Sequence, residues 1–441
     1  MRKKKRDYSQ ELLSKIKKRK AKVGIIGLGY VGLPLAMELA KVGFHILGVD
    51  VSQEKIRSLK KGKSYITDVN NDEIRKFVLR ERCIQVSSSY NLLRKADVVC
   101  VTVPTPLKKT KDPDISFIVS AITELKRVFH PGILIVLEST TYPGTTREFI
   151  VSEIERMGYK AGKDFFVAYS PERVDPGNPR FTTKNIPKVI GAITETCRKL
   201  AYELYSTFLK NIHIVETVEE AEMAKLLENT FRAVNIGLVN EMTIMCERMG
   251  INIWNVIEAA STKPFGFMPF YPGPGIGGHC IPLDPLYLSY RAKMYNFYNR
   301  FIELATDING NMPRFVLSKL SQILNRDKKS LNGSRILLLG IAYKANVNDI
   351  RESPSREVYR LLLNENAIVD YYDPLIPEFR ESGKRIKSIS LKPEVIRKYD
   401  CVVVTTGHSD VDYKLVLKYA WSIFDTRNVY KGVNSDKITR L

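Results

Sequence analysis

The sequence predicts an α/β protein in which two doubly wound domains are joined by a long central helix and a helical middle domain. Three observations support this fold class. Short apolar segments alternate with helical patterns at the start of the chain, the same alternation returns near its end, and about 30 residues of helical pattern lie between them. At 441 residues the chain is also too long for one ordinary core, so two or three domains are expected.

The first α/β region begins after Lys22. Its expected strands are continuously apolar, which is typical of a parallel sheet that helices cover on both faces. These strands are 23–27, 45–50, 96–103 and 132–138, with a helix at 33–42 between the first two.

The pattern changes at Thr217, where Thr217 and Glu220 have the spacing of a helix capping box. Apart from Gly237, no break appears before Gly250, so one helix of roughly 45–50 Å is expected. A helix of that length outruns one globular core. We expect it to bridge two domains or to pack against a partner subunit.

The end of the chain repeats the first pattern, with a strand at 335–340, a helix at 353–363, a strand ending at Asp373 and an apolar segment at 400–407. We therefore expect a second, smaller Rossmann-like domain. The boundaries that follow are 1–21 for a basic leader, 22–215 for the first α/β domain, 216–325 for the central helical domain and 326–441 for the second α/β domain.

The composition, with 44% apolar and 27% charged residues, is that of an ordinary soluble globular protein. The longest apolar runs fall short of the roughly 20 residues that span a bilayer, and the charged N-terminus lacks the apolar core of a signal peptide. Six cysteines at irregular spacing, without a CxxC pair, favour neither a disulfide framework nor a metal site. We expect a reduced, cytoplasmic setting.

The net charge of +21 is unevenly distributed. Residues 1–22 hold eleven Lys and Arg against Asp7 and Glu11, which gives +9 and leaves +12 for the rest of the chain. We interpret the leader as a solvated basic segment, with contact to nucleic acid or anionic lipid as the alternative. The remaining charge suits an enzyme whose substrate and cofactor both carry diphosphates.

Gly27, Gly29 and Gly32 form a G-x-G-x-x-G motif between the first strand and its helix. The first glycine permits a tight turn, the second lets the backbone approach a pyrophosphate, and the third allows close packing of helix and sheet. Asp50 ends the second strand, where a carboxylate can bind both ribose hydroxyls and would repel a 2′-phosphate. The motif favours NAD over NADP. A glycine-rich turn without a nucleotide is the alternative.

Two loops rich in hydroxyl groups, 102–106 and 138–144, follow later strands of the same sheet. Open α/β sheets bind ligands at the carboxyl ends of their strands, so these hydroxyls could contact a cofactor or an ordered water. The alternative is that both segments are simply polar loops.

Cys280 stands in the most informative segment, where four glycines, Gly273, Gly275, Gly277 and Gly278, precede His279. Glycines let backbone amides crowd a ligand and leave a thiol unshielded, and a nucleophilic thiol needs a lowered pKa or a nearby base. We interpret Cys280 as a nucleophile, the other five cysteines as small core residues, and His279 as a loop residue.

Lys225 and Asn229 stand four residues apart on the expected long helix and therefore share one face. Taken alone, such a pair is typical of a solvated helical face.

The chain resembles the UDP-sugar 6-dehydrogenase family from about Lys22 to its C-terminus. The resemblance rests on ordered motifs, namely GLGYVGLP from Gly27, VPTP from Val103, ESTTYPGTT from Glu138, SPER from Ser170, KLLENTFRAVNI from Lys225, GPGIGGHCIPLDP from Gly273 and GIAYKANVNDIRESP from Gly340.

The resemblance implies that NAD contacts the three glycines of the first motif together with Tyr30, Val31, Asp50, Thr105, Thr140 and Arg351. The implied sugar-nucleotide site contains Glu172, Arg173, Lys225, Asn229, Gly275, Gly277 and Lys344. For Lys344 and Arg351, surface charges near a helix start are the alternative. Family members dimerise through the long helix, so a homodimer is expected.

The resemblance also implies a reaction. Cys280 would attack the C6 aldehyde formed by a first hydride transfer, and a second hydride transfer would leave a thioester that water hydrolyses. Lys225 and Asn229 would stabilise the oxyanion, Asp284 with an ordered water would act as base, and Glu172 would assist the hydrolysis.

Leu283 stands where the UDP-glucose enzymes commonly have lysine, and the residues after Ser170 also differ from theirs. These choices resemble the branch that oxidises UDP-N-acetylglucosamine, for surface polysaccharide or glycan precursors. UDP-glucose, UDP-N-acetylmannosamine and UDP-N-acetylgalactosamine remain alternative substrates.

A second function class is a basic NAD-sensing or nucleic-acid-binding protein with a vestigial site. The presence of Cys280, Lys225, Asn229 and Asp284 argues against it, and no nucleic acid partner is expected.

Overall fold

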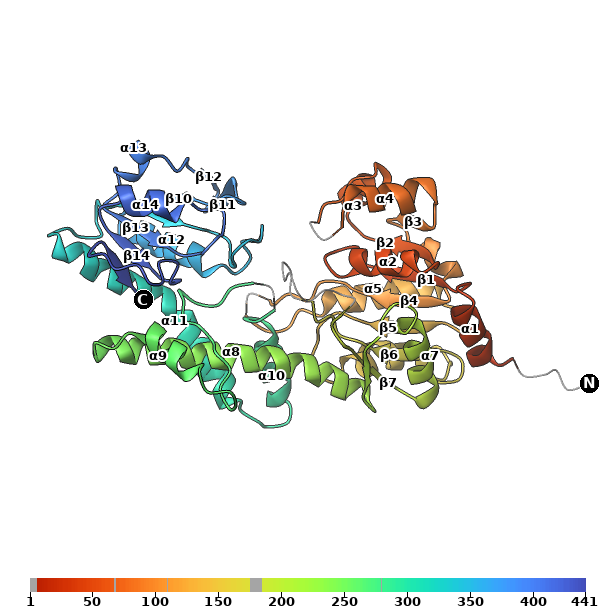
Figure 1. Cartoon of the computed structure of the whole chain (residues 1–441). Helices are drawn as coiled ribbons and strands as arrows, with labels where there is room; N and C mark the ends of the chain where they lie inside the picture. The colour runs from red at the N-terminus through yellow and green to blue at the C-terminus, as the bar shows by residue number, and fades with distance from the viewer. Residues whose placement is uncertain (1–5, 67–68, 109, 175–184, 279) are drawn as a thin grey trace, which may run out of the picture. The chain divides into compact units, whose positions relative to one another are not determined.

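The computed structural model describes residues 6–66, 69–108, 110–174, 185–278 and 280–441. The chain forms two compact units, coloured along its length in Figure 1. Unit 1 comprises Met1–Glu228 with Leu286–Tyr295, and unit 2 comprises Asn229–Pro285 with Asn296–Leu441.

Unit 1 is built on an eight-stranded sheet with the strand order β3-β2-β1-β4-β5-β6-β7-β8. Its strands are β1 Lys22–Ile26, β2 His45–Val49, β3 Ile84–Ser87, β4 Val98–Val101, β5 Leu134–Leu137, β6 Phe166–Tyr169, β7 Lys188–Ala192 and β8 Ile212–Ile214. The strands expected from the sequence in this region are confirmed to within about two residues at each end.

Helices cover both faces of this sheet. They are α1 Tyr8–Lys17, α2 Gly32–Lys41, α3 Gln53–Lys60, α4 Asn71–Ile74, η1 Arg75–Arg80, η2 Tyr90–Lys95, α5 Ser116–Val128, η3 Arg147–Val151, α6 Ser152–Glu155 and α7 Glu195–Tyr205. Successive strand residues join different clusters, since Ile25 packs in the core with α2 and α7 and Ile26 packs in the core with α5. This two-sided burial is why the strands are continuously apolar.

One pair of strands departs from the parallel sheet that the sequence suggested, because β7 runs antiparallel to β6. Parallel neighbours need a crossover segment, usually a helix. The described part of the connection between β6 and β7 contains no helix, which fits the change of direction.

The basic leader is not wholly solvated, so our interpretation is wrong for residues 8–17. These residues form α1, which packs against α7 through the buried side chains of Leu12 and Ile16. Asp7 caps the helix, and Lys15 Nζ lies 2.6 Å from Asp97 Oδ1. The charged residues are spaced with a helical period, which leaves one apolar face on the helix. Because the prediction rested only on the net charge of the segment, it did not include this face.

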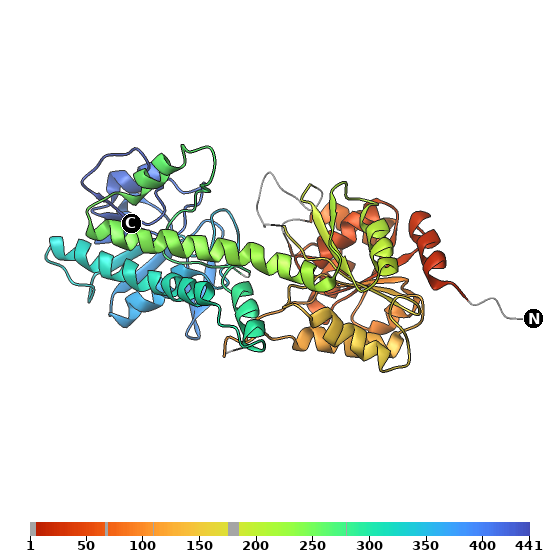
Figure 2. The ribbon, with the colours of Figure 1, turned by 90° about the horizontal axis from the view of Figure 1, so that it is seen from below.

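The long helix is confirmed as α8, Val218–Arg248, with 31 residues. Its capping box is reciprocal, because Thr217 Oγ1 accepts from the backbone of Glu220 while Glu220 accepts from the backbone of Thr217. In unit 2, α8 lies beside α11, where Gly237 lets the two helices approach closely at Ala305. Both views show these helices side by side (Figures 1 and 2).

Unit 2 contains a five-stranded parallel sheet with the order β10-β9-β13-β14-β15, and an antiparallel hairpin β11-β12. The strands are β9 Arg335–Leu339, β10 Ile368–Tyr372, β11 Glu378–Glu381, β12 Lys384–Lys387, β13 Cys401–Val404, β14 Ile423–Asp425 and β15 Ile438–Arg440. The helices after α8 are α9 Ile253–Ala260, α10 Asp284–Lys293, α11 Arg300–Arg326, α12 Pro354–Asn364, α13 Pro393–Ile396 and α14 Tyr413–Tyr419. Most of α10 belongs to unit 1.

The second sheet repeats the local plan of the first, as the sequence predicted. After β4, Thr102 Oγ1 donates to the carbonyl of Gly27, and after β13, Thr405 Oγ1 donates to the carbonyl of Gly340. The carboxylate of Asp50 after β2 accepts from the backbone N–H of Leu28, and the carboxylate of Asp373 after β10 accepts from that of Ile341. Each contact holds the backbone that follows the first strand of its sheet. The expected fold class, α/β with two Rossmann-like sheets and a helical middle region, is confirmed.

Within the described residues, no helix is long and apolar enough to cross a membrane.

Candidate active site

The glycine motif of unit 1 has the conformation that its spacing predicts. Gly27 has φ +95°, which favours glycine, and a Cβ on Gly32 would lie 2.0 Å from the carbonyl oxygen of Gly27. No atom lies within 4 Å of the position that a Gly29 Cβ would take. The turn and the helix packing therefore need Gly27 and Gly32, while Gly29 faces open space that a ligand can approach.

Asp50 is buried at the end of β2 and holds the glycine motif in place. Its Oδ2 accepts from the backbone N–H of Leu28 at 2.9 Å, and its Oδ1 accepts from Ser52 at 2.9 Å. Lys55 Nζ also lies 2.9 Å from Oδ2, and Tyr65 donates its hydroxyl to the carbonyl of Leu28. Sequence reasoning missed Lys55 and Tyr65, although Lys55 stands one helical turn after the Ser52 cap.

The two hydroxyl-rich loops meet at the carboxyl ends of β4 and β5. Ser139 Oγ donates to the carbonyl of Val103 at 2.7 Å, which ties the second loop to the first. Thr105 is buried and Thr140 is half-buried in these loops. Tyr30 is half-exposed, and Val31 precedes α2 as its N-cap. The expected NAD residues other than Arg351 therefore surround the carboxyl ends of neighbouring strands in unit 1.

Glu172 and Arg173 follow β6 and are fixed by several contacts in unit 1. Glu172 Oε1 accepts from the backbone N–H groups of Arg173 and Val174, both at 2.8 Å. The Arg173 guanidinium pairs with Glu228 of α8 at 2.7 Å and donates to the carbonyl of Pro187. The rest of the segment, 175–184, lies outside the described residues.

Lys225 and Asn229 are both buried on α8, with 8% and 5% of their surface exposed. The solvated-face interpretation of this pair is therefore wrong. Burial of a lysine and an asparagine is costly unless both groups bind partners, which favours a functional role over a surface role. Lys225 belongs to unit 1 and Asn229 to unit 2.

Cys280, Asp284 and Asn229 come together in unit 2 at the start of α10. The backbone carbonyl of Cys280 accepts from the N–H of Asp284 at 2.8 Å, so one turn of chain separates the thiol from the carboxylate. Asp284 is buried, and Asn229 Nδ2 donates to its Oδ2. Cys280 is half-buried. A nucleophile, a base and an amide donor can act together from such a cluster.

Four of the other five cysteines are buried, as the core interpretation requires, whereas Cys83 is only half-buried. His279 lies outside the described residues.

The glycine-rich loop 273–278 packs against the segment that carries Lys344 and Arg351, also in unit 2. A Cβ on Gly277 would lie 2.7 Å from the carbonyl oxygen of Glu352, and the N–H of Gly278 donates to the carbonyl of Arg351. A Cβ on Gly275 would likewise lie close to other parts of the chain, at 3.0 Å from Pro354 and 3.2 Å from the carbonyl oxygen of Asn309. These glycines thus allow close packing of two loops, a reason that sequence reasoning did not consider.

Lys344 is half-buried, and the exposed Arg351 has its guanidinium held by Asp349 at 2.6 Å. The contact at Asp349 orients the guanidinium, while its exposure leaves a ligand room to reach it.

Arg427 is a further cation of unit 2 that sequence reasoning missed. It follows β14, donates Nε to the carbonyl of Thr405, and its guanidinium occupies the space where a Gly273 side chain would be. Burial lowers the pKa of Arg427 to about 10, so it stays protonated at neutral pH. The available signal was an arginine just after a parallel strand, at the ligand-binding edge of the sheet.

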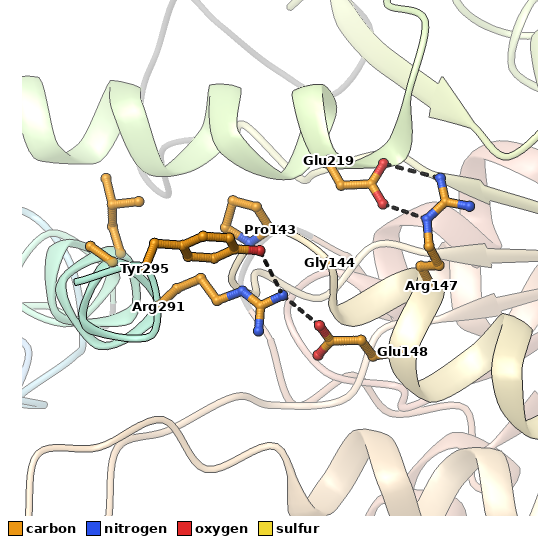
Figure 3. Close-up of a pocket in the computed structure, with 9 residues that line it drawn as sticks. Pro143, Gly144, Arg147, Glu148, Glu219, Arg291 and Tyr295 are labelled. Carbon is orange, nitrogen blue, oxygen red and sulfur yellow. Dashed lines mark hydrogen bonds and ion pairs between the residues drawn. The ribbon is translucent and has the colours of Figure 1, made fainter. Parts of the chain in front are cut away.

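Unit 1 also contains a cavity of about 490 Å³, whose lining includes none of the residues predicted for the site. Figure 3 shows its two ion pairs, Arg147 with Glu219 and Arg291 with Glu148. Beside it, the buried carboxylate of Glu222 accepts from the backbone N–H groups of Gly144 and Thr146. This contact holds the loop after β5 to the first turns of α8.

Among the described residues no group of His, Cys, Asp and Glu could hold a metal ion. The donor set of the candidate site suits a nucleotide cofactor and thiol chemistry.

Comparison with known proteins gives three family matches in order along the chain. Residues 21–209 match the NAD binding domain of the UDP-glucose/GDP-mannose dehydrogenase family, residues 219–311 its central domain, and residues 337–432 its UDP binding domain.

Individual relatives cover most of the chain. A UDP-N-acetyl-D-glucosamine 6-dehydrogenase of Pseudomonas aeruginosa is 36% identical over 80% of this chain and 83% of its own length. One of Salmonella typhi is 34% identical over 88% and 90%. The solved UDP-D-ManNAc dehydrogenase of Pyrococcus horikoshii has 32% identity and a TM-score of 0.86, covering 95% of this chain and 98% of that one.

Proposed function

Because the chain belongs to the UDP-glucose/GDP-mannose dehydrogenase family, we propose that it oxidises the C6 hydroxymethyl group of UDP-N-acetylglucosamine to a carboxylate. The observation that carries this proposal is the cluster of Cys280, Asp284 and Asn229 in unit 2. An NAD-dependent dehydrogenase that stops at the aldehyde needs no thiol. A thiol one turn of chain before a buried carboxylate supports covalent capture of that aldehyde and a second oxidation.

NAD, when bound, accepts a hydride in each of the two oxidations. Gly29 leaves room for its pyrophosphate, and Asp50 has its carboxylate at the end of β2, where a ribose would bind. The glycine motif and Asp50 therefore suit a dinucleotide, which supports the proposal that unit 1 binds the cofactor.

The protein's own groups perform the carbon chemistry. The Cys280 thiolate adds to the C6 aldehyde, and the aldehyde oxygen takes up a proton to give a thiohemiacetal. Loss of hydride from that carbon, together with loss of the hydroxyl proton, leaves a thioester. Asp284 takes the protons that these steps release, while Lys225 and the Asn229 amide stabilise the developing oxyanion. Glu172 assists the water that releases the carboxylate product.

In unit 2, Lys344 and Arg427 are positive groups beside the loop that carries Cys280, and we assign to them the diphosphate of the sugar nucleotide. We also assign Glu172 and Arg173 to binding of the sugar.

UDP-N-acetylglucosamine is the proposed substrate because two relatives at 34–36% identity carry that name. UDP-N-acetylmannosamine is a strong second candidate, since the Pyrococcus enzyme named for it matches nearly the whole chain. UDP-glucose and UDP-N-acetylgalactosamine complete the set. We further propose a cytoplasmic homodimer whose product serves surface polysaccharide or glycan synthesis.

A panel of these four UDP-sugars, with NADH and uronic acid both quantified, tests the proposal. We expect two NADH per sugar and the highest kcat/KM with UDP-N-acetylglucosamine. A ratio of one NADH per sugar would contradict the four-electron reaction, and a preference for another sugar would change only the substrate.

Cys280→Ala is expected to lose formation of the uronic acid, because no thiohemiacetal can form. Cys83→Ala removes a half-buried cysteine of unit 1 outside the proposed site, and it should keep wild-type activity. Uronic acid formation by Cys280→Ala at the wild-type rate would exclude the covalent mechanism.

A further inference from the structure

Beneath Glu172, unit 1 contains a buried ion cluster that the reaction described above does not use. Lys188, the first residue of β7, places its Nζ 2.7 Å from Glu138 Oε2 and 3.6 Å from Glu172 Oε2. The side chain of Glu138 is fully buried and that of Lys188 is 9% exposed. A single ammonium group therefore lies between two carboxylates, one in the interior and one in the candidate site.

The interior side of this cluster is rigidly anchored. Tyr205 of α7 donates its hydroxyl to Glu138 Oε1 at 2.6 Å, so both oxygens of Glu138 are engaged. The Lys188 ammonium also lies 5.2 Å from the centre of the Tyr205 ring. Burial by itself lowers the pKa of Lys188, but Glu138 and Glu172 outweigh burial and raise it, so the group is a fixed positive charge.

The contacts of Glu172 divide its two oxygens between different tasks. Oε1 accepts the two backbone N–H groups described above, whereas Oε2 is directed at Lys188. Without Lys188, no side chain of β7 would hold the second oxygen, and two carboxylates would lie near each other in a buried site without a cation. Such an arrangement is strongly unfavourable, and Glu172 would move away from Glu138.

We propose that Lys188 is a positioning residue that holds the Glu172 carboxylate in place for hydrolysis of the thioester, with Glu138 and Tyr205 as its anchor. The proposal rests on the function proposed above. In this step Glu172 accepts a proton from water, the water oxygen adds to the thioester carbonyl, and the C–S bond breaks to return the Cys280 thiolate. Lys188 acts through Glu172, since its own side chain is only 9% exposed.

Lys188→Met tests the proposal because it removes the charge and keeps an unbranched side chain. A rapid-quench experiment with UDP-sugar and NAD measures NADH release and the covalent sugar adduct of the protein by mass spectrometry. We expect the first turnover to release NADH at nearly the wild-type rate, the adduct to accumulate, and its hydrolysis to slow by about 10- to 100-fold. Lys188→Arg, which retains the charge, should hydrolyse the adduct faster than Lys188→Met.

Lys319→Met is the matched control, since Lys319 is also a buried lysine paired with a glutamate, Glu247, but lies in unit 2. It should lower the melting temperature without accumulation of adduct. Equal slowing of NADH release and hydrolysis in Lys188→Met, or no adduct, would overturn the positioning role and leave a purely structural one.

Tyr205→Phe provides a second variant if Lys188→Met fails to fold. It removes the hydrogen bond to Glu138 and leaves Lys188 in place, so we expect a smaller slowing of the same hydrolysis step. Unchanged hydrolysis in Tyr205→Phe would overturn the proposal. Failure of the proposed function is distinguishable, because the wild-type protein would then form no adduct at Cys280 at all.

Discussion

The carboxylate of Asp50 combines two tasks at one position. It accepts hydrogen bonds from Leu28 and Ser52, which shape the glycine motif. In the proposed function, its charge would also repel a 2′-phosphate. Because Lys55 contacts the same oxygen, part of that charge is already balanced within the protein. We therefore propose that both Asp50 and Lys55 influence cofactor choice at this position.

Asp50→Asn should reduce this selectivity. The change removes the negative charge and one acceptor, and hydrogen bonds to charged groups contribute about 1.5–3 kcal/mol. We expect kcat/KM for NAD to fall about tenfold or more and the ratio of NADP to NAD use to rise, as measured by initial rates with each cofactor. Asp72→Asn, at an exposed carboxylate of the same unit, is the control. An unchanged ratio would show that another group excludes NADP.

Glu222 makes the stability of unit 1 depend on pH. Burial raises its pKa from the ordinary 4.5 to about 7, although hydrogen bonds from Thr146 and Gly144 oppose the shift. Between these pH values the folded protein binds a proton that the unfolded chain releases. Stability attributable to this group therefore falls as pH rises through 4.5 to 7, by an amount on the order of 3 kcal/mol.

Glu222→Gln cannot ionise and should lack this pH dependence. The variant loses one acceptor at every pH, but its melting temperature relative to wild type should increase between pH 5 and pH 8. Differential scanning calorimetry at several pH values measures the difference, with the exposed Glu54→Gln as control. Parallel curves for wild type and Glu222→Gln would contradict the assignment.

At the scale of elements, α1 adds to the first α/β domain a helix that precedes the first strand. Leu12 and Ile16 lie one turn apart and enter the core beside α7, while Ser14 faces solvent on the other side of the helix. A similar ion pair occurs just before β9. There Lys329 contacts Asp400, as Lys15 contacts Asp97 before β1. The leader is thus partly a structural element rather than a free basic arm.

Ile16→Ala should destabilise unit 1 while leaving the chemistry intact. Truncation of a fully buried isoleucine costs about 2–5 kcal/mol, which corresponds to a loss of at least about 4 °C in melting temperature for a unit of this size. Ser14→Ala should stay near wild type. Equal melting temperatures for Ile16→Ala and wild type would mean that α1 does not stay docked in solution.

At the scale of the whole molecule, α8 presents an apolar stripe for which a second chain is the proposed partner. Phe231, Leu238 and Met245 recur every seven residues on α8, and Met249 follows directly after the end of the helix. Their exposed fractions are 46%, 51%, 44% and 61%, respectively. A seven-residue apolar repeat is the pattern by which helices pack against one another, and it supports the proposed homodimer.

Leu238→Glu places a charge in the centre of this stripe and should convert the dimer into monomers, as measured by light scattering after size-exclusion chromatography. Arg232→Glu, on a neighbouring exposed face of α8, should remain dimeric. If the wild-type protein is itself monomeric at micromolar concentration, or if Leu238→Glu remains dimeric, the stripe is not the dimer interface.

Periodicity and local signals were sufficient for most of the architecture. The glycine motif, the alternating apolar strands and the capping box at Thr217 each act within a few residues, so the sequence alone indicated β1, α2, β9, α8 and their order. The antiparallel β7 was missed because strand direction depends on pairing partners distant in sequence. Charge obscured α1, whose helix depends on a contact with α7, nearly two hundred residues away.

The sequence by itself determined the fold class, the family and the identity of the candidate nucleophile, because glycine spacing and motif order are properties of the chain. Only the tertiary structure decided which groups meet. Glu138, Lys188 and Tyr205 are distant in sequence and form one buried cluster, and Arg427 enters space left by Gly273. Such contacts arise when strands and helices pack, and the energy of a buried charge depends on partners that no local pattern specifies.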